Sequence, residues 1–246
     1  AKIIRLLQAV TNPRLMLEND STFNVKKLTG TRENVEVLKT IAKMSKTEIS
    51  PKIVKAGAIA KDLITGKGTF KEKNQRNVII YTLFRGNAFI LEKILKKYKP
   101  LVVTGEFPLE KREERILEFK KWNPAKEKHG RVLIATLGSI AEAVSLHRYD
   151  KRTVCQDVIY LERSYNAGQW IQSLFRVYRI GSLKTKPITY YTLESTTTDG
   201  LGTIDHDIDG ILTIRKKRME ELLNDRMRLR KTSFGDEYDT EEDKDI

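Results

Sequence analysis

The segment NAGQWIQSLFRVYRIG, residues 166–181, carries the side chains that are best suited to binding phosphate. Gln169, Gln172, Arg176 and Arg179 follow one another at intervals of three, four and three residues, which places them on one stripe of a helix. Arginine suits phosphate because its guanidinium is planar, stays charged and can donate two parallel hydrogen bonds. The stripe therefore predicts a phosphate-binding surface, although the solvated face of an ordinary amphipathic helix has the same pattern.

Apolar residues on another side of this segment should hold the helix against a core. Ile171, Leu174, Phe175 and Tyr178 form that apolar stripe. A helix anchored along one side presents the arginines and glutamines of its other side in a fixed direction.

Five short apolar runs predict the strands of a parallel sheet, at 78–81, 101–103, 132–135, 158–161 and 188–193. Helical patterns lie between them, at 88–98, 109–122, 140–146 and 168–178. Strands that alternate with crossover helices are typical of an α/β fold whose parallel sheet is covered by helices on both faces.

Polar residues collect directly after four of these runs, at 82–84, 104–105, 136–145 and 162–166. In open parallel sheets, ligands bind outside the carboxyl ends of the strands. The fourth stretch leads directly into the arginine-bearing helix. The predicted sheet therefore gathers its polar residues and this helix at one edge.

Helical patterns flank the sheet region on both sides. We expect an N-terminal helical segment and linker over residues 1–76, a sheet-containing lobe over 77–200, and an amphipathic bracing helix over 201–234. Basic residues at 215–218 interrupt this last helix, and they suit either a solvated face or a direct nucleic-acid contact. Residues 235–246 are strongly acidic and predict a disordered tail.

The formal net charge of this 246-residue chain is +13, and it is unevenly distributed. Residues 236–246 carry a net charge of −6, so the rest of the chain carries +19. A basic body favours a polyanion such as nucleic acid as the partner. Because the sequence has neither a run of about 18 apolar residues nor a signal-peptide pattern, we expect a soluble intracellular protein of the cytoplasm or nucleus without a membrane partner.

Several classes of site are disfavoured by composition. Cys155 is the only cysteine and the three histidines show no metal-ligand spacing, so neither a disulfide nor a metal site is expected. No GxGxxG motif follows the first predicted strand, which argues against a nucleotide-dependent dehydrogenase or methyltransferase on a similar sheet.

Six segments, taken in order, resemble the second motor lobe of superfamily-two helicases, in the Swi/Snf-type branch of double-stranded DNA translocases. One short motif would be weak because such patterns recur by chance, whereas six in order with near-family spacing are specific. The segments are IIRLLQAVTNP (3–13), NVIIYTLFRGNAFILEKIL (77–95), GEFPLEKREERILEFKKW (105–122), VLIATLGSIAEAVSL (132–146), residues 166–181, and GTIDHDIDGIL (202–212).

The match is closest in the family's sixth motif. Asn166, Gln172, Arg176, Arg179 and Gly181 keep the spacing that this motif has in the family.

The family's fifth motif is where the sequence departs from the pattern. Ile140, Ala141 and Ala143 stand where the family has glycines, and Ser145 replaces an asparagine. This departure favours a second possibility, a non-catalytic nucleic-acid-binding module that kept the fold of the motor lobe.

The resemblance implies a RecA-like lobe that works with a separate N-terminal lobe, on which ATP and Mg²⁺ are bound. Arginine fingers stabilise the charge that develops during phosphoryl transfer. By the match, Arg176 and Arg179 are the finger candidates, and Gln172 would orient the finger helix or the attacking water. Gln169 is a further candidate for nucleotide contact, because of its place on the stripe.

The resemblance also implies a grip on the backbone of double-stranded DNA. Backbone N–H groups and hydroxyls can hold phosphates without reading the base sequence, so binding should be sensitive to salt and tolerant of sequence. The candidate DNA-binding residues are Thr82, Phe84, Gly105, Thr136, Ser145 and Asn166.

The sequence lacks two motifs that a complete motor needs. The string GKGT at 66–69 has no Ser or Thr directly after its lysine and follows no predicted strand, and an Asp-Glu-x-His box is absent. We therefore expect this chain to be one part of a two-lobe ATPase. By itself it should neither bind ATP tightly nor hydrolyse it.

Overall fold

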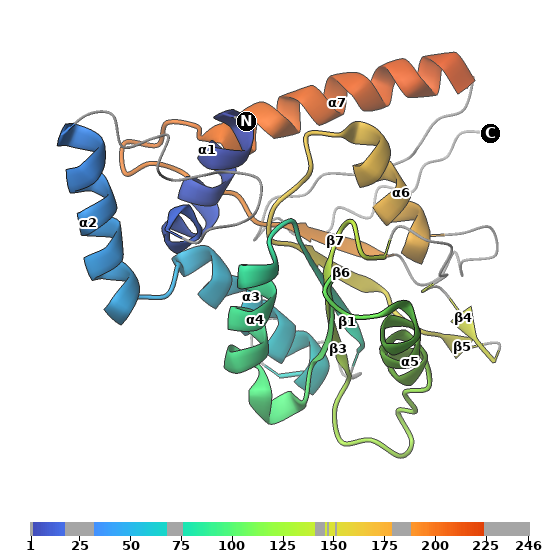
Figure 1. The fold of residues 1–246 in the computed structure, drawn as a ribbon. Helices are drawn as coiled ribbons and strands as arrows, with labels where there is room; N and C mark the ends of the chain where they lie inside the picture. Colours follow the sequence, from blue (N-terminus) through green and yellow to red (C-terminus); the bar gives the residue numbers. More distant parts are fainter. Residues whose placement is uncertain are drawn as a thin grey trace.

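The computed structural model describes residues 2–17, 32–67, 76–140, 146, 148–150, 152–178 and 188–223 (Figure 1). Arg179, Gly181, Ser145 and the predicted acidic tail lie outside the described residues. The other candidate residues are placed by a central sheet and the helices that cover it.

The centre of the fold is a five-stranded sheet with the order β2-β3-β1-β6-β7, in which all neighbouring strands are parallel. The strands are β1 (Val78–Thr82), β2 (Leu101–Val103), β3 (Val132–Thr136), β6 (Asp157–Tyr160) and β7 (Thr189–Thr192). The prediction of a parallel α/β sheet is thereby confirmed. β1 is the central strand and all five of its residues are buried, as expected for a strand that is covered on both faces.

Alternate residues of β1 face two separate cores, because successive side chains of a strand point to opposite faces of a sheet. Val78 and Ile80 pack with α3 (Pro51–Thr65) and α4 (Arg85–Ile94). Ile79 and Tyr81 face the core that contains residues of the other covering helices (Figure 1). Those helices are α1 (Lys2–Thr11), α5 (Leu109–Lys120), α6 (Ala167–Val177) and α7 (Ile204–Leu223).

Helix α3 belongs to the N-terminal segment by sequence, yet it packs directly on the sheet. Ile53, Ile59 and Ile64 of α3 are buried against the strands. The helix begins with Pro51 at its first helical position and ends at Gly66, whose left-handed φ of 63° suits a glycine after a helix.

The remaining elements lie around this core. They are η1 (Pro13–Met16), α2 (Arg32–Thr47), η3 (Lys96–Tyr98), and the hairpin of β4 (Arg148–Tyr149) and β5 (Arg152–Thr153). The hairpin was not predicted, because two-residue strands carry no recognisable periodicity. The helix expected near 140–146 is not seen in its described part, since residues 137–140 form a turn and residues 141–145 lie outside the described residues.

Helix α7 is held against the body of the fold by buried charges. Lys52 of α3 contacts Asp205 of α7, and Arg163 contacts Glu194 and Asp209. Arg163 lies in the loop that leads from β6 into α6, so its contact with Asp209 lets α7 brace the segment that carries the arginine helix. Among the helices that the structure describes, none combines the length and the apolar character needed to cross a bilayer.

Candidate functional site

Helix α6 is fixed by a cap at its start and by one buried side. The side-chain Oδ1 of Asn166 accepts a hydrogen bond of 3.3 Å from the backbone N–H of Gln169, an N-cap that satisfies one of the free donors of the first turn. The buried apolar residues of the helix are Trp170, Ile171, Leu174 and Val177.

The predicted apolar stripe of α6 was right for two residues and wrong for two. Ile171 and Leu174 are buried, whereas Phe175 is 41% exposed and Tyr178 is 54% exposed. The intervals between Trp170, Leu174 and Val177 define the side that meets the sheet, and Phe175 lies about 100° around the helix from Leu174. Tyr178 follows the end of the helix with an extended backbone, so helical spacing no longer applies to it.

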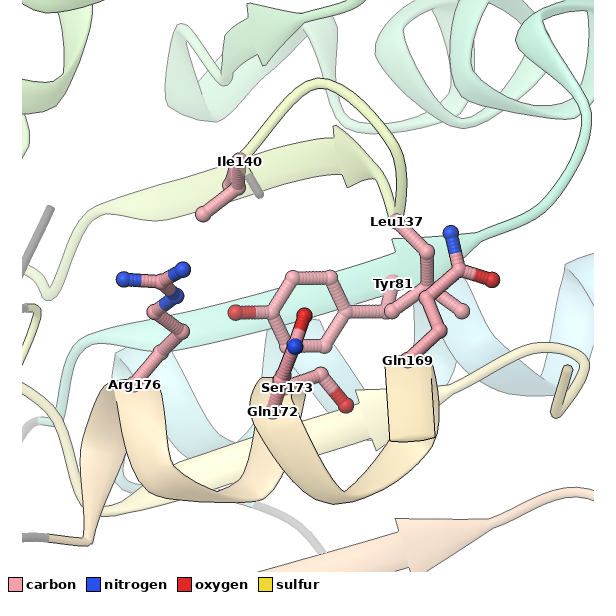
Figure 2. Close-up of a pocket in the computed structure, with 7 residues that line it drawn as sticks. All are labelled: Tyr81, Leu137, Ile140, Gln169, Gln172, Ser173 and Arg176. Atoms are coloured by element: carbon pink, nitrogen blue, oxygen red, sulfur yellow. The ribbon is translucent and has the colours of Figure 1, made fainter. Parts of the chain in front are cut away.

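The opposite side of α6 lines a pocket beneath the loop that follows β3 (Figure 2). Gln169, Gln172 and Arg176 point from the helix toward this loop, which contributes Leu137 and Ile140. Tyr81 of β1 and Ser173 of α6 complete the lining. The structure thus brings together three of the four residues of the predicted stripe; the fourth, Arg179, lies outside the described residues.

Arg176 occupies the last turn of α6, where the partial negative charge of the helix end favours a cation. Its side chain is half-buried and lines the pocket. Its backbone carbonyl accepts a hydrogen bond of 2.9 Å from the N–H of Leu146, which ties the far end of the loop after β3 to the helix. The guanidinium is therefore placed at the junction of this loop and α6.

A row of three tyrosines on adjacent strands lies beneath α6. The rings of Tyr81 and Tyr160 stack with centroids 5.4 Å apart, and those of Tyr160 and Tyr190 stack at 6.4 Å. Burial raises the pKa of all three hydroxyls, so they are neutral at physiological pH. Tyr81, the one of the three that lines the pocket, consequently gives it an aromatic and uncharged surface.

Glu162 follows β6 and is buried at the carboxyl end of the sheet. Its carboxylate accepts hydrogen bonds from Thr82 Oγ1 at 2.8 Å, from Leu83 N at 3.0 Å and from Asn87 Nδ2 at 2.6 Å. Loss of solvation nevertheless raises the pKa of Glu162 to about 7, which these hydrogen bonds only partly counteract. This carboxyl group joins the ends of β1 and β6 to the first turn of α4.

The hydrogen bonds of Glu162 bear on two of the predicted DNA-binding residues. Thr82 is fully buried and its hydroxyl is already donated to Glu162. Phe84 is 7% exposed, packs in the core, and gives its N–H to Thr82 Oγ1. Neither side chain therefore faces solvent in this structure, and their role in binding DNA stays a prediction.

A second polar cluster lies after β2 and β3. Thr136 Oγ1 is 2.9 Å from Ser139 Oγ, and a guanidinium N–H of Arg112 donates to the carbonyl of Ser139 at 3.1 Å. Thr104 Oγ1 and Arg112 Nε are buried without a hydrogen-bond partner among the described residues. Gly105 is exposed next to Thr104, and an added Cβ there would meet no atom within 4 Å. Polar groups of two strand ends thus gather as predicted for this edge.

Some residues of these clusters were missed by sequence reasoning. Tyr81 lies within an ordinary apolar run, and nothing in its spacing sets it apart. The only feature of the sequence that pointed to the burial of Glu162 is its place directly after a strand. Asn166 was predicted as a DNA contact, and the structure shows it as the N-cap of α6.

Within the described ranges, no group of three His, Cys, Asp or Glu side chains is arranged to bind a metal ion.

The chain has only a loose structural similarity to known proteins. No protein-family model matches the chain, and no curated protein is similar to it in sequence. The C-terminal part of the Fun30 ATPase domain is 20% identical with a TM-score of 0.49; the match covers 85% of this chain but only 64% of that one. The C-terminal domain of the Sulfolobus solfataricus SWI2/SNF2 ATPase is 16% identical with a TM-score of 0.44, over 90% of this chain and 84% of that one. The E. coli DEAD-box protein SrmB is 16% identical with a TM-score of 0.45, over 67% and 78%.

Proposed function

We propose that this chain is the C-terminal, RecA-like motor lobe of an ATP-dependent DNA helicase or translocase of the Swi/Snf type. In this role it supplies arginine fingers to ATP and Mg²⁺ held on a separate N-terminal lobe. The observation that carries the proposal is the placement of Gln172 and Arg176 on the side of α6 that lines the pocket, at the spacing of the family's sixth motif. Arg179, at the next family position, is proposed as the second finger.

The chemistry of the pocket supports this role. Phosphoryl transfer requires positive charge at the γ-phosphate and an oriented water. Arg176 can donate two parallel N–H groups to phosphate oxygens, and the amides of Gln169 and Gln172 can donate or accept beside it. Helix α6 is rigid, because it is capped at Asn166 and packed on the tyrosine row. A rigid support lowers the entropy that is lost when the transition state forms.

The grip on nucleic acid is proposed for the carboxyl edge of the sheet. Thr104, Thr136 and Arg112 lie there, and two of their polar atoms are buried without a partner among the described residues. Buried polar groups normally find a partner, so these atoms suit a ligand such as a phosphate oxygen. Contacts of this kind hold the nucleic-acid backbone without reading its bases.

The test joins this lobe to the lobe that binds ATP and measures ATP hydrolysis stimulated by nucleic acid. Arg176→Ala should lower kcat by about 10³–10⁵-fold, the range for loss of an arginine finger. Lys93→Ala, which removes an exposed cation in the last turn of α4, is the matched control and should leave kcat unchanged. Duplex DNA and duplex RNA are compared as stimulators, and the proposal expects stimulation by DNA.

A non-catalytic nucleic-acid-binding module is the second candidate, and one observation favours it. Ile140, which stands where the family has glycine, is only 3% exposed and its side chain lines the pocket. An apolar side chain therefore fills space that a glycine would leave open to nucleotide or DNA. Unchanged ATP turnover in Arg176→Ala, together with salt-sensitive nucleic-acid binding, would select this module over the motor lobe.

A further inference from the structure

The three tyrosines beneath α6 are similarly buried, but they differ in the hydrogen bonds of their hydroxyl groups. The hydroxyl of Tyr160 lies 2.6 Å from Ser173 Oγ, and that of Tyr190 donates to the carbonyl of Leu174 at 3.0 Å. Both hydroxyls therefore fasten α6 to the sheet. The hydroxyl of Tyr81 is buried as well, yet it has no hydrogen-bond partner among the described residues.

An unpartnered buried hydroxyl is unfavourable, because it has lost its water without gaining a protein partner. Phenylalanine would fill the same space without this loss. The side chain of Tyr81 is 1% exposed and belongs to the core cluster, so the position accepts a ring of this size. Since no described residue satisfies the hydroxyl, a group that moves next to it in another state of the protein could be its partner.

The direction of the Tyr81 ring identifies that partner. Figure 2 shows the ring lying along the floor of the pocket with its hydroxyl turned toward the guanidinium of Arg176. The positive charge of Arg176 acts on this hydroxyl, since it lowers the pKa of Tyr81 against the larger effect of burial. The two groups thus share one end of the pocket, and rotation about the side-chain bonds of Arg176 can bring them together.

We infer that the hydroxyl of Tyr81 accepts an N–H hydrogen bond from Arg176 when the motor is engaged with nucleotide, and so holds the guanidinium in its working orientation. This inference rests on the proposed function. A guanidinium has five N–H donors, so two can face phosphate while another faces Tyr81. Tyr81 is then a positioning residue, which touches the finger and not the phosphate.

A neutral tyrosine hydroxyl is better suited than a carboxylate to accept this hydrogen bond from Arg176. A carboxylate in this place would form an ion pair with Arg176 and hold it away from an anionic ligand. A neutral hydroxyl orients the guanidinium but leaves its charge available to phosphate. Such support from a second layer of residues lowers the freedom of a functional side chain before its ligand arrives.

The three tyrosines provide matched variants for the test. In thermal unfolding of this chain, Tyr160→Phe and Tyr190→Phe each remove a satisfied hydrogen bond and should lower Tm by about 2–4 °C. Tyr81→Phe removes an unsatisfied hydroxyl and should not lower Tm. A fall in Tm like that of Tyr190→Phe would mean that the Tyr81 hydroxyl is already bonded in the free lobe, and would overturn the inference.

The second measurement uses the lobe joined to its ATP-binding partner lobe. Tyr81→Phe should lower kcat for stimulated ATP hydrolysis about tenfold, the value of one hydrogen bond to a charged group, with KM for ATP unchanged. Lys93→Ala, at an exposed position of α4, should keep kcat. In the Arg176→Ala background, Tyr81→Phe should cause no further loss, because its effect passes through Arg176.

The outcomes separate this inference from the proposed function. Full kcat in Tyr81→Phe, beside an inactive Arg176→Ala, overturns the inference and leaves the proposed function standing. A further loss in the double variant also overturns it, because Tyr81 would then act on something other than Arg176. Full kcat in Arg176→Ala overturns both.

Discussion

The ammonium nitrogen of Lys52 lies 2.7 Å from Oδ2 of Asp205, and each of the two side chains is only 4% exposed. Lys52 belongs to α3, which covers the sheet, and Asp205 belongs to the first turn of α7. The same Oδ2 accepts a hydrogen bond of 2.9 Å from the backbone N–H of Ser195. A single carboxylate therefore joins an early helix, the segment after β7 and the bracing helix.

Removal of one partner from this buried pair should be strongly destabilising. Lys52→Met leaves the carboxylate of Asp205 without its cation in a site that excludes water. The free energy of unfolding should fall by about 3–5 kcal/mol, as measured by urea denaturation. The control is Arg85→Met, whose partner Glu106 is 45% exposed, and which should change stability by less than about 1 kcal/mol. Equal losses in the two variants would contradict the burial of the Lys52 pair.

Glu162 should make stability depend on pH between about 4.5 and 7. Its pKa is raised from an ordinary 4.5 to about 7 in the folded state, so over this range the folded protein binds more protons than the unfolded chain. The contribution of Glu162 to the free energy of unfolding should therefore fall by about 3 kcal/mol as the pH rises through this window, and stay level above it.

The matched variant for this prediction is Glu162→Gln, which keeps the shape of the side chain but does not titrate. Urea denaturation of both proteins at several pH values between 5 and 8 isolates the effect, because other groups contribute equally to both. Asp157, whose pKa is also raised by burial, is one such group. A constant difference in stability across this range would show that Glu162 does not titrate there.

Arg163 should control how firmly α7 is docked. Its guanidinium, 7% exposed, contacts Oε1 of Glu194 at 2.7 Å and also contacts Asp209. Arg163→Met should weaken the local stability of α7 by about 3 kcal/mol, seen as faster amide hydrogen exchange in that helix than in β1. Arg215→Met, which removes an exposed hydrogen bond to the carbonyl of Tyr165, should have little effect on the same amides. Exchange that rises equally in β1 would point to global unfolding instead.

Asn166 allows the capping role to be separated from the predicted nucleic-acid contact. Asn166→Ala removes the cap and should lower the free energy of unfolding by about 1 kcal/mol. Asn166→Asp keeps a capping oxygen and adds a negative charge at a position that the sequence predicts to contact DNA, so stability should be retained while duplex DNA affinity at low salt falls. Equal DNA affinity in wild type and Asn166→Asp would place the phosphates elsewhere.

Much of the fold could be predicted because its signals are local. The five apolar runs match the five strands of the sheet to within one or two residues, since central parallel strands need continuous apolar sequence. The spacing of Gln169, Gln172 and Arg176 predicted a shared side of one helix, and the structure has them on one side of α6. Regular helical geometry makes such an inference secure over a few turns.

The sequence by itself thus determined the order of elements, the parallel sheet and the stripe that bears the arginine. Only the tertiary structure decided which groups meet across that framework. It exposed Phe175, buried Thr82 against Glu162, and left the hydroxyl of Tyr81 facing Arg176 without a partner among the described residues. The physical reason is that backbone periodicity depends on neighbouring residues, whereas burial and hydrogen-bond partners can depend on residues far away in the chain. Thr82 and its partner Glu162, for example, are 80 positions apart.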